Sequence, residues 1–187
     1  MQDSLCPFGP AFRREREQRK ISQWTVSVRL QYHTRNIQRI EGGLRQPGVL
    51  LALRMVAAVD ADPGKFFETL CQKIASERYD GLLSPTKRVR VTYQPPEATE
   101  GLKSLFGPLL AQARQAVGMS QTAMAKYAGY NLRNINAVEK GKQEPGVMSA
   151  LALVTATGVD IREFFDQLHQ FAAISSNGSS EHEEYGQ

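Results

Sequence analysis

The chain has 187 residues, of which 41% are hydrophobic and 22% charged, so it has an ordinary globular composition and room for two small domains. It contains no apolar run long enough to span a bilayer, no apolar core of a signal peptide, and two cysteines, which are too few for a disulfide framework or a metal site. We therefore expect a cytoplasmic protein with no membrane partner, and the net charge of +4 fits a polyanionic partner without establishing one.

The first part of the chain predicts about five helices. Proline is favoured in the first turn of a helix, and serine or aspartate side chains accept hydrogen bonds from its free N–H groups. Apolar residues at helical spacing follow each expected start, and a Phe-Phe pair is expected to dock the fifth helix on the core. The expected starts are Gly9 with Pro10, Ser22, Thr34, Pro47, and Asp62 with Pro63.

A connecting segment follows. The fifth helix is expected to continue to about Arg78 and to end near Asp80 and Gly81. Val89–Tyr93 alternates like a short strand, but no second strand is evident. It would either pair with its own copy across a dimer axis or lie as an extended linker. Because isolated strands are unstable, the sequence favours the linker.

A stretch beginning at Ser120 predicts two short helices joined by a tight turn. Ser120 caps the first helix, and Gly129 supplies a residue that readily takes a positive φ at the corner. Asn131 caps the second helix, which turns Ile135 and Val138 inward and polar side chains outward. Two helices joined by a short glycine turn, the second with a polar outer face, are typical of a helix-turn-helix.

The same pattern occurs 98 residues earlier, and 8–70 aligns with 106–168 without a gap, with 23 of 63 positions identical. We call these ranges the first and second repeats. A match of this length indicates two copies of one domain, so the expected fold class is all-α, with two tandem five-helix domains joined by a linker. The expected boundaries are 1–79 for the first domain, 80–103 for the linker, 104–172 for the second domain and 173–187 for a disordered acidic tail.

Charge is distributed unevenly along the chain. The first repeat carries 11 Lys and Arg residues against 6 Asp and Glu residues, whereas the second carries 6 against 5. The tail holds an excess of glutamate. The first repeat should therefore carry the stronger positive field.

A characteristic set of residues recurs in both repeats: an arginine in helix one, Ser-Gln opening helix two, two aliphatic residues in helix three, and Glu, Gly and Pro after them. In the second repeat these are Arg114, Ser120, Gln121, Ile135, Val138, Glu139, Gly141 and Pro145, and in the first they are Arg16, Ser22, Gln23, Ile37, Ile40, Glu41, Gly43 and Pro47.

These residues, which lie in about two thirds of the chain, resemble the pattern of the lambda-repressor-like helix-turn-helix domain of the Cro/XRE family of bacterial and phage regulators. The first repeat departs from the pattern at the corner, where Gln31 stands in place of Gly129. A side chain in the left-handed region costs roughly 1 kcal/mol, so the sequence leaves the geometry of this turn open.

The resemblance implies a sequence-specific regulator of transcription, of the repressor type, that binds double-stranded DNA in the nucleoid through the third helix of each repeat. In the family, this helix enters the major groove, where side chains meet base edges. Outward positions that include Leu132 and Ala137 are implied to face the bases. The implied DNA-binding residues are Gln23, His33, Thr34, Arg35, Asn36, Arg39, Arg45, Gln121, Asn131, Arg133, Asn134, Lys140 and Lys142.

Two classes of function remain open. No catalytic constellation, phosphate loop or metal-ligand spacing is present in the sequence, so we expect no enzyme, no cofactor and no metal site. The alternative to a DNA-binding regulator is a protein-interaction module on a helix-turn-helix scaffold, in which one or both repeats do not bind DNA. The acidic tail and the nearly neutral second repeat slightly favour this alternative, whereas Arg35, Arg39, Arg45 and the Arg-Asn-Ile sequence shared by both repeats favour the DNA-binding regulator.

Other paired residues are interpreted as structural. The pairs Arg16–Glu41 and Arg114–Glu139 are each expected to join helix one to the end of helix three inside a repeat. A homodimer is left open as a further assembly, through the paired phenylalanines or through Val89–Tyr93.

Overall fold

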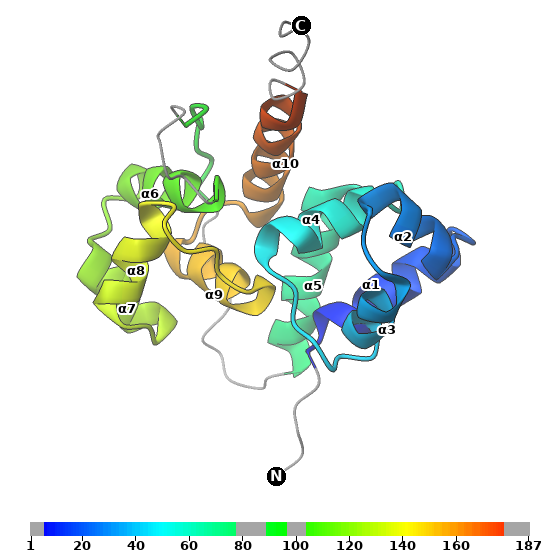
Figure 1. Cartoon of the computed structure of the whole chain (residues 1–187). Coiled ribbons are helices and arrows are strands. Elements are labelled where there is room, and N and C mark those ends of the chain that lie inside the picture. Colours follow the sequence, from blue (N-terminus) through cyan, green and yellow to red (C-terminus); the bar gives the residue numbers. More distant parts are fainter. Residues whose placement is uncertain (1–5, 78–88, 97–103, 178–187) are drawn as a thin grey trace, which may run out of the picture.

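The computed structural model describes residues 6–77, 89–96 and 104–177, and these residues form ten α-helices (Figure 1). The predicted all-α fold is confirmed, and no described helix has the length and apolarity needed to cross a membrane. The helices are α1 (Phe8–Gln18), α2 (Gln23–Leu30), α3 (Thr34–Glu41), α4 (Val49–Ala57), α5 (Pro63–Glu77), α6 (Phe106–Ala116), α7 (Gln121–Ala128), α8 (Leu132–Glu139), α9 (Val147–Thr157) and α10 (Ile161–Asn177).

The sequence repeat is also a repeat of helix boundaries, because each helix from α6 to α10 begins 98 residues after its counterpart among α1 to α5. One predicted boundary needs correction. Residues 173–177, expected to begin the disordered tail, belong to α10. The remaining tail, 178–187, and the linker residues 80–88 and 97–103 lie outside the described residues.

Side chains cap five of the described helices at their starts. Each cap satisfies a backbone N–H that has no partner within its helix. One of these caps is the Asp62 carboxylate, and the hydrogen bond that it accepts from the backbone N–H of Lys65 lowers its pKa below the usual value. The bonds are Thr25 N to Ser22 Oγ (2.9 Å), Ala123 N to Ser120 Oγ (3.1 Å), Arg133 N to Asn131 Oδ1 (2.8 Å), Lys65 N to Asp62 Oδ1 (2.8 Å) and Glu163 N to Asp160 Oδ1 (3.1 Å).

The start of the first helix differs from the prediction. Helix α1 begins at Phe8 rather than after Gly9, so Pro10 lies inside its first turn. Gly9 has a packing role instead, because a Cβ there would overlap the carbonyl oxygen of Ile40 near the end of α3. The equivalent Gly107 lies equally close to α8. These glycines let the first helix of each repeat approach the third.

The turn of the first repeat has the geometry of the second. Gln31 takes a φ of 50°, in the left-handed region, and Gly129 takes a φ of 69°. In both repeats the N–H after the corner bonds to the carbonyl five residues earlier. In the first repeat the hydroxyl of Ser27 adds a bond to the carbonyl of Tyr32 (2.6 Å). The question that the sequence left open is therefore resolved: a glutamine adopts the conformation of the turn glycine.

Because Gln31 holds a left-handed conformation that glycine adopts without a steric penalty, Gln31→Gly should raise the free energy of unfolding by about 1 kcal/mol. Urea denaturation followed by circular dichroism measures this change. Gln38→Gly, at an exposed position inside α3, is the control and should instead lower stability by about 1 kcal/mol. A loss of stability in Gln31→Gly would contradict the strain argument.

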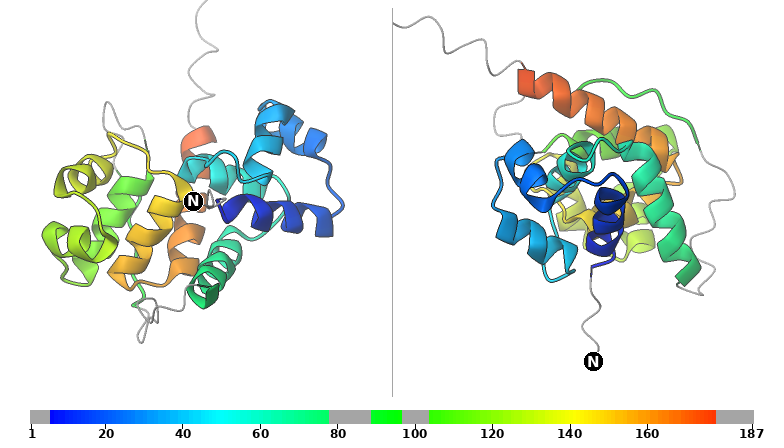
Figure 2. Two further views of the ribbon diagram at one scale, coloured as in Figure 1. Left: turned by 90° about the horizontal axis from the view of Figure 1, so that it is seen from below. Right: turned by 90° about the vertical axis from the view of Figure 1, so that its right-hand side faces the viewer.

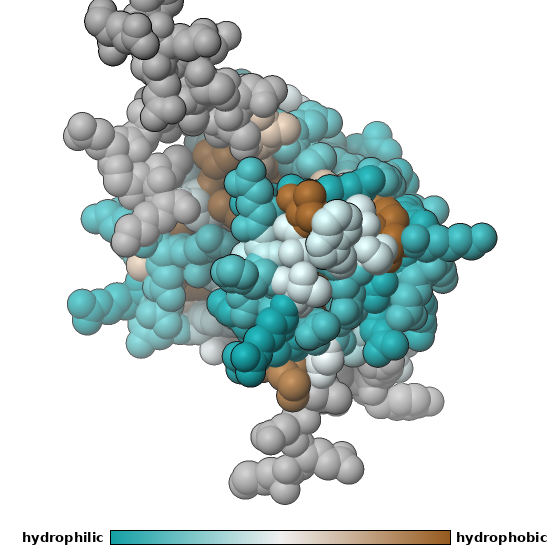
Figure 3. Space-filling model, turned by 45° about the vertical axis from the view of Figure 1, so that its right-hand side comes forward, coloured by the Kyte–Doolittle hydropathy of each residue, from teal (hydrophilic) through white to brown (hydrophobic). Residues whose placement is uncertain are grey.

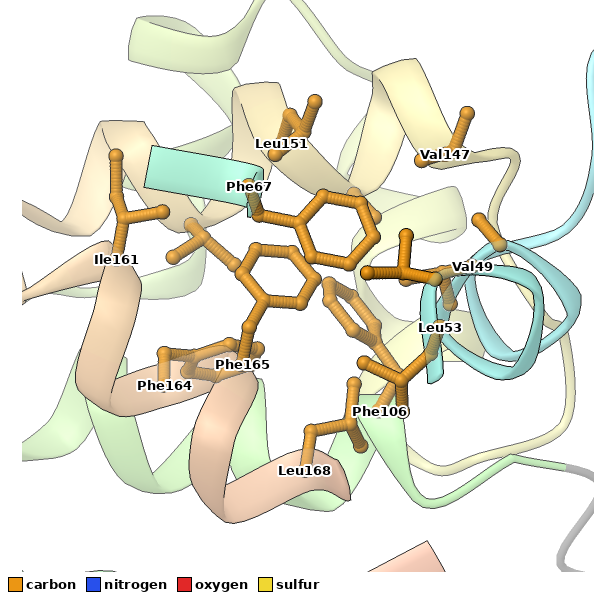
Figure 4. Close-up of a cluster of buried hydrophobic side chains, with 14 of the residues drawn as sticks. Val49, Leu53, Phe67, Phe106, Val147, Leu151, Ile161, Phe164, Phe165 and Leu168 are labelled. Carbon is orange, nitrogen blue, oxygen red and sulfur yellow. The ribbon is translucent and has the colours of Figure 1, made fainter. Parts of the chain in front are cut away.

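One apolar core joins the two repeats. At its centre the fully buried rings of Phe67 from α5 and Phe165 from α10 stack with their centroids 4.1 Å apart. Each ring also packs edge-on against the neighbouring phenylalanine, Phe66 or Phe164. Figure 4 shows Phe67 and Phe165 surrounded by aliphatic side chains from both repeats. The repeats therefore bury their apolar surfaces against each other.

A second contact between the repeats lies just before the fourth helix of each repeat, α4 and α9. The backbone before α4 runs antiparallel to the backbone before α9 and exchanges a reciprocal pair of hydrogen bonds with it. Val49 N donates to Pro145 O and Val147 N donates to Pro47 O, both at 3.0 Å. Such reciprocity, in which equivalent residues exchange the same bonds, indicates a two-fold relation between the repeats.

Side chains also cross between the repeats to cap helices. The carboxylate of Glu144 accepts from the N–H of Leu50 in α4 (3.0 Å). The amide oxygen of Gln46, oriented to satisfy its neighbours, accepts from the N–H of Met148 in α9 (3.1 Å). Each repeat therefore satisfies a free N–H group at the start of the other repeat's fourth helix.

The described part of the expected linker packs on the second repeat. Val89 accepts from Asp160 N (3.0 Å) and donates to Gly158 O (3.2 Å), forming an isolated parallel bridge. Val91 and Tyr93 are buried, and the Tyr93 ring lies edge-on to Phe164, with centroids 5.6 Å apart. The segment 89–96 is thus extended, as predicted, but it is held against α10 instead of lying free.

The surfaces expected to support a homodimer are occupied within one chain. The paired phenylalanines form the inter-repeat core, and the apolar residues of Val89–Tyr93 that are buried contact the second repeat. Dimerisation through either surface would require this packing to open.

Candidate nucleic-acid interface

Helix α3 separates its buried and exposed faces cleanly. Ile37 and Ile40 are fully buried, whereas Arg35, Gln38 and Arg39 are exposed. The other two predicted contacts at its start are His33, which precedes the helix and is exposed, and Thr34, which is half-buried. The outer face of α3 is therefore rich in donors and acceptors.

Helix α8 presents the equivalent face in the second repeat. Its inner side buries Ile135 and Val138, as the helical spacing predicted. The exposed residues of its first turn are Leu132, Arg133 and Asn134, preceded by the exposed cap Asn131, and Ala137 is half-buried one turn later.

A buried ion pair fixes each of these helices to helix one. Arg16 Nε lies 2.6 Å from Glu41 Oε1, Arg16 Nη2 lies 2.9 Å from Oε2, and Nη1 donates to Ile21 O (2.8 Å). The hydrogen bonds to Glu41 raise the pKa of Arg16 above its usual value. Arg114 makes the same bidentate contact with Glu139, so the structural role expected for both pairs is confirmed.

The predicted phosphate contacts Gln23 and Gln121 have a second role. Gln23 Nε2 donates to Glu41 Oε2 (2.7 Å), and Gln121 Nε2 donates to Glu139 Oε2 (2.6 Å). The sequence did not predict these bonds. Since an amide nitrogen carries two hydrogens, one donor of each glutamine is left for a phosphate.

Cationic and polar side chains continue beyond the helices. Arg45 is exposed after α3 and donates to Asn36 Oδ1 (3.2 Å), so these two predicted contacts are joined. Lys140 and Lys142 are exposed after α8. These positions lie beside the polar faces of α3 and α8.

Many other cations of the first repeat are already neutralised. Arg13 pairs with Glu17 (2.8 Å), Arg19 with Glu15 (2.6 Å) and Arg29 with Asp60 (2.9 Å). By contrast, the arginines on the outer faces of α3 and α8 form no ion pair with any residue that the structure describes: Arg35, Arg39 and Arg133. Their charges are available to an external anion.

Helices α3 and α8 lie at the same end of the two-fold axis, because a rotation about an axis leaves the height along that axis unchanged. Figure 1 places them on opposite flanks of the molecule, and the left view of Figure 2 shows both in its upper half. The two helices therefore lie toward one side of the molecule, which the sequence alone did not reveal.

Among the described residues, one pocket near these helices is small. A shallow pocket of about 100 Å³, lined partly by Tyr130, Asn134 and Glu144, lies beside α8. Ligand sites for drug-sized molecules are roughly 300–1,000 Å³. Among the described residues, no cluster of His, Cys, Asp and Glu is suited to a metal ion, and Cys6 and Cys71 form no disulfide.

Comparison with known proteins identifies a helix-turn-helix in the second repeat. No curated protein and no solved structure matches the chain. Residues 110–164, which extend from α6 into α10, match the family model described as Helix-turn-helix. The second repeat therefore contains a helix-turn-helix domain, in which α7 and α8 are the two helices of the motif.

Proposed function

We propose that the protein is a sequence-specific regulator of transcription, of the repressor type, that binds double-stranded DNA with both repeats. Its recognition helices are α3 and α8. The observation that carries this proposal is that α3 and α8 lie toward one side of the molecule and expose Arg35, Arg39 and Arg133, which form no ion pair with the described residues. The family match supports a DNA partner for the second repeat, and the equivalent helix boundaries extend the proposal to the first.

The chemistry of these faces suits the major groove. An arginine bonds guanine O6 and N7 through two parallel hydrogen bonds, and each such contact contributes about 1–3 kcal/mol of discrimination. Asn134, exposed on α8, is of a type that bonds adenine in the same way. We assign base contacts to the outer residues of α3 and α8, with His33 and Asn131 at their starts.

Phosphate contacts would fix the orientation of the protein on the duplex. We assign these to Gln23 and Gln121 and to the cations beyond the recognition helices, Arg45, Lys140 and Lys142. A DNA-binding regulator of this kind would work in the cytoplasm, in the nucleoid.

One observation favours the alternative, a protein-interaction module. Trp24 and Val28 lie one turn apart on α2 and are 69% and 55% exposed, whereas the second repeat has Thr122 and Lys126 at these positions. Figure 3, with the first repeat turned toward the viewer, shows a few hydrophobic side chains among hydrophilic neighbours. Exposed apolar patches often mark protein contacts, so the two functions are separated by experiment.

Arg35→Ala and Arg133→Ala should each weaken binding to a selected DNA site by about 1–3 kcal/mol, or roughly fivefold to 160-fold, because each removes a bidentate base contact. Fluorescence anisotropy with a labelled duplex measures the affinity. Arg14→Ala, which removes an exposed arginine from α1, is the matched control and should leave the preference for the site unchanged. Parent-like affinity in both recognition-helix variants would contradict the assignment.

Titration with salt separates the two functions. Binding to random duplex should weaken steeply between about 50 and 200 mM salt, since each neutralised phosphate releases counterions. An interaction module would show no affinity for duplex at low salt, and that result would overturn the proposed function.

A further inference from the structure

We infer that one chain recognises an imperfect inverted repeat of DNA, with two unequal half-sites, as a monomer. This inference rests on the proposed function and specifies the DNA that the two recognition helices would bind together.

The orientation follows from which residues meet between the repeats. Gly48 pairs with Gly146, and Phe67 stacks on Phe165, and in each pair the two residues occupy equivalent positions of the repeat. Equivalent residues meet each other only when two units are related by a two-fold axis. Units that follow one another head to tail bring unlike residues together. The tandem order in sequence is thus a two-fold arrangement in space.

A two-fold arrangement of recognition helices matches the symmetry of the duplex. The strands of B-DNA are themselves related by two-fold axes, so equivalent protein surfaces meet half-sites in inverted orientation. Because α3 and α8 lie at the same end of the protein axis, one duplex can contact both. Half-sites in direct orientation would present the second helix with the wrong polarity.

The spacing of the half-sites is fixed by packing. The stacked pair Phe67–Phe165, the backbone exchange before α4 and α9, and the crossing caps Gln46 and Glu144 all join the repeats directly. The repeats therefore cannot adjust their separation as two domains on a flexible tether would. Five added base pairs, about half a helical turn, would turn one half-site to the far side of the duplex.

The half-sites differ because the outer faces differ. Both repeats share the Arg-Asn pair, Arg35-Asn36 and Arg133-Asn134, and should share the bases that these residues contact. One helical turn later, the first repeat has the exposed Arg39 where the second repeat has the half-buried Ala137. Arginine favours guanine, whereas an apolar side chain contacts the methyl group of thymine. We therefore expect guanine at this position of the first half-site and thymine, or no preference, in the second.

The full chain tests this inference on a DNA element selected from random duplexes. The two selected half-sites are then placed in inverted orientation, in direct orientation, and in inverted orientation with five added base pairs. We expect tight binding to the selected inverted element and at least roughly tenfold weaker binding to the other two, with one chain per duplex by sedimentation. Equal binding to direct and inverted elements, or two chains per element, would overturn the inference while leaving DNA binding intact. A selection that enriches no sequence would instead overturn the proposed function.

Two variants test the inequality of the half-sites. Ala137→Arg should shift the second half-site toward guanine at the base that faces residue 137. The selected element should then become more symmetric. Arg39→Ala is the matched control and should remove the guanine preference from the first half-site alone. Unchanged base preferences in both variants would overturn the assignment of the difference to this pair.

Discussion

Replacing Phe67 by alanine should lower the free energy of unfolding by about 3–5 kcal/mol, because a fully buried aromatic side chain leaves a large cavity when truncated. The ring stacks on Phe165 across the inter-repeat contact, so the loss should reach both repeats. Denaturation with urea, followed by circular dichroism for all helices and by fluorescence of Trp24, the single tryptophan, should show coincident transitions.

The control for this variant is Tyr127→Ala, which removes an aromatic side chain that is 70% exposed. Its effect should stay within about 0.5 kcal/mol. If Phe67→Ala destabilised the first repeat while the remaining helices unfolded as in the parent, the two repeats would be independent domains. The shared core would then have no thermodynamic consequence.

Replacing Glu41 by alanine should cost about 3–5 kcal/mol of stability, because buried Arg16 loses its bidentate partner and keeps only the looser contact with Glu17, at 3.7 Å. Gln23 loses its acceptor in the same variant. Chemical denaturation again measures the change. Glu15→Ala, which breaks the more exposed pair with Arg19, is the matched control and should cost less than about 1 kcal/mol.

A double substitution identifies the cause of this loss. Arg16→Met combined with Glu41→Leu removes both charges and should recover most of the stability lost in Glu41→Ala, since apolar residues of similar size often replace a buried ion pair well. A double variant as unstable as Glu41→Ala would show that packing, rather than an unpaired charge, dominates the effect.

Local features of the repeats could be predicted from the sequence because short-range rules determine them. Ser120 and Asn131 accept from nearby backbone N–H groups whatever the rest of the fold does. Ile135 and Val138 face inward because their spacing matches the helical period. The recurrence of Arg114 and Glu139 at the equivalent positions of the first repeat, Arg16 and Glu41, likewise predicted a pair that the structure shows.

The arrangement of the repeats could not be predicted in this way. The sequence predicts Phe67 as a core residue of the first repeat and Phe165 as a core residue of the second. Nothing in their spacing indicates that the two rings pack on each other. Val91 and Tyr93 gave a weak strand pattern, yet their burial depends on a surface of α10 that forms only after the second repeat folds. Gln31 violated the local preference for glycine and still adopted the turn, because the surrounding helices determine the corner.

The reciprocal interface has a consequence for assembly. Since each repeat offers the other the same surface, repeats from two chains can in principle exchange partners, as in domain swapping. The covalent connection opposes this exchange, because a short tether holds the second repeat at an effective concentration on the order of millimolar. Pairing within the chain therefore prevails in dilute solution. We therefore expect each chain to keep both proposed recognition helices together at concentrations far below those at which two separate subunits would dissociate.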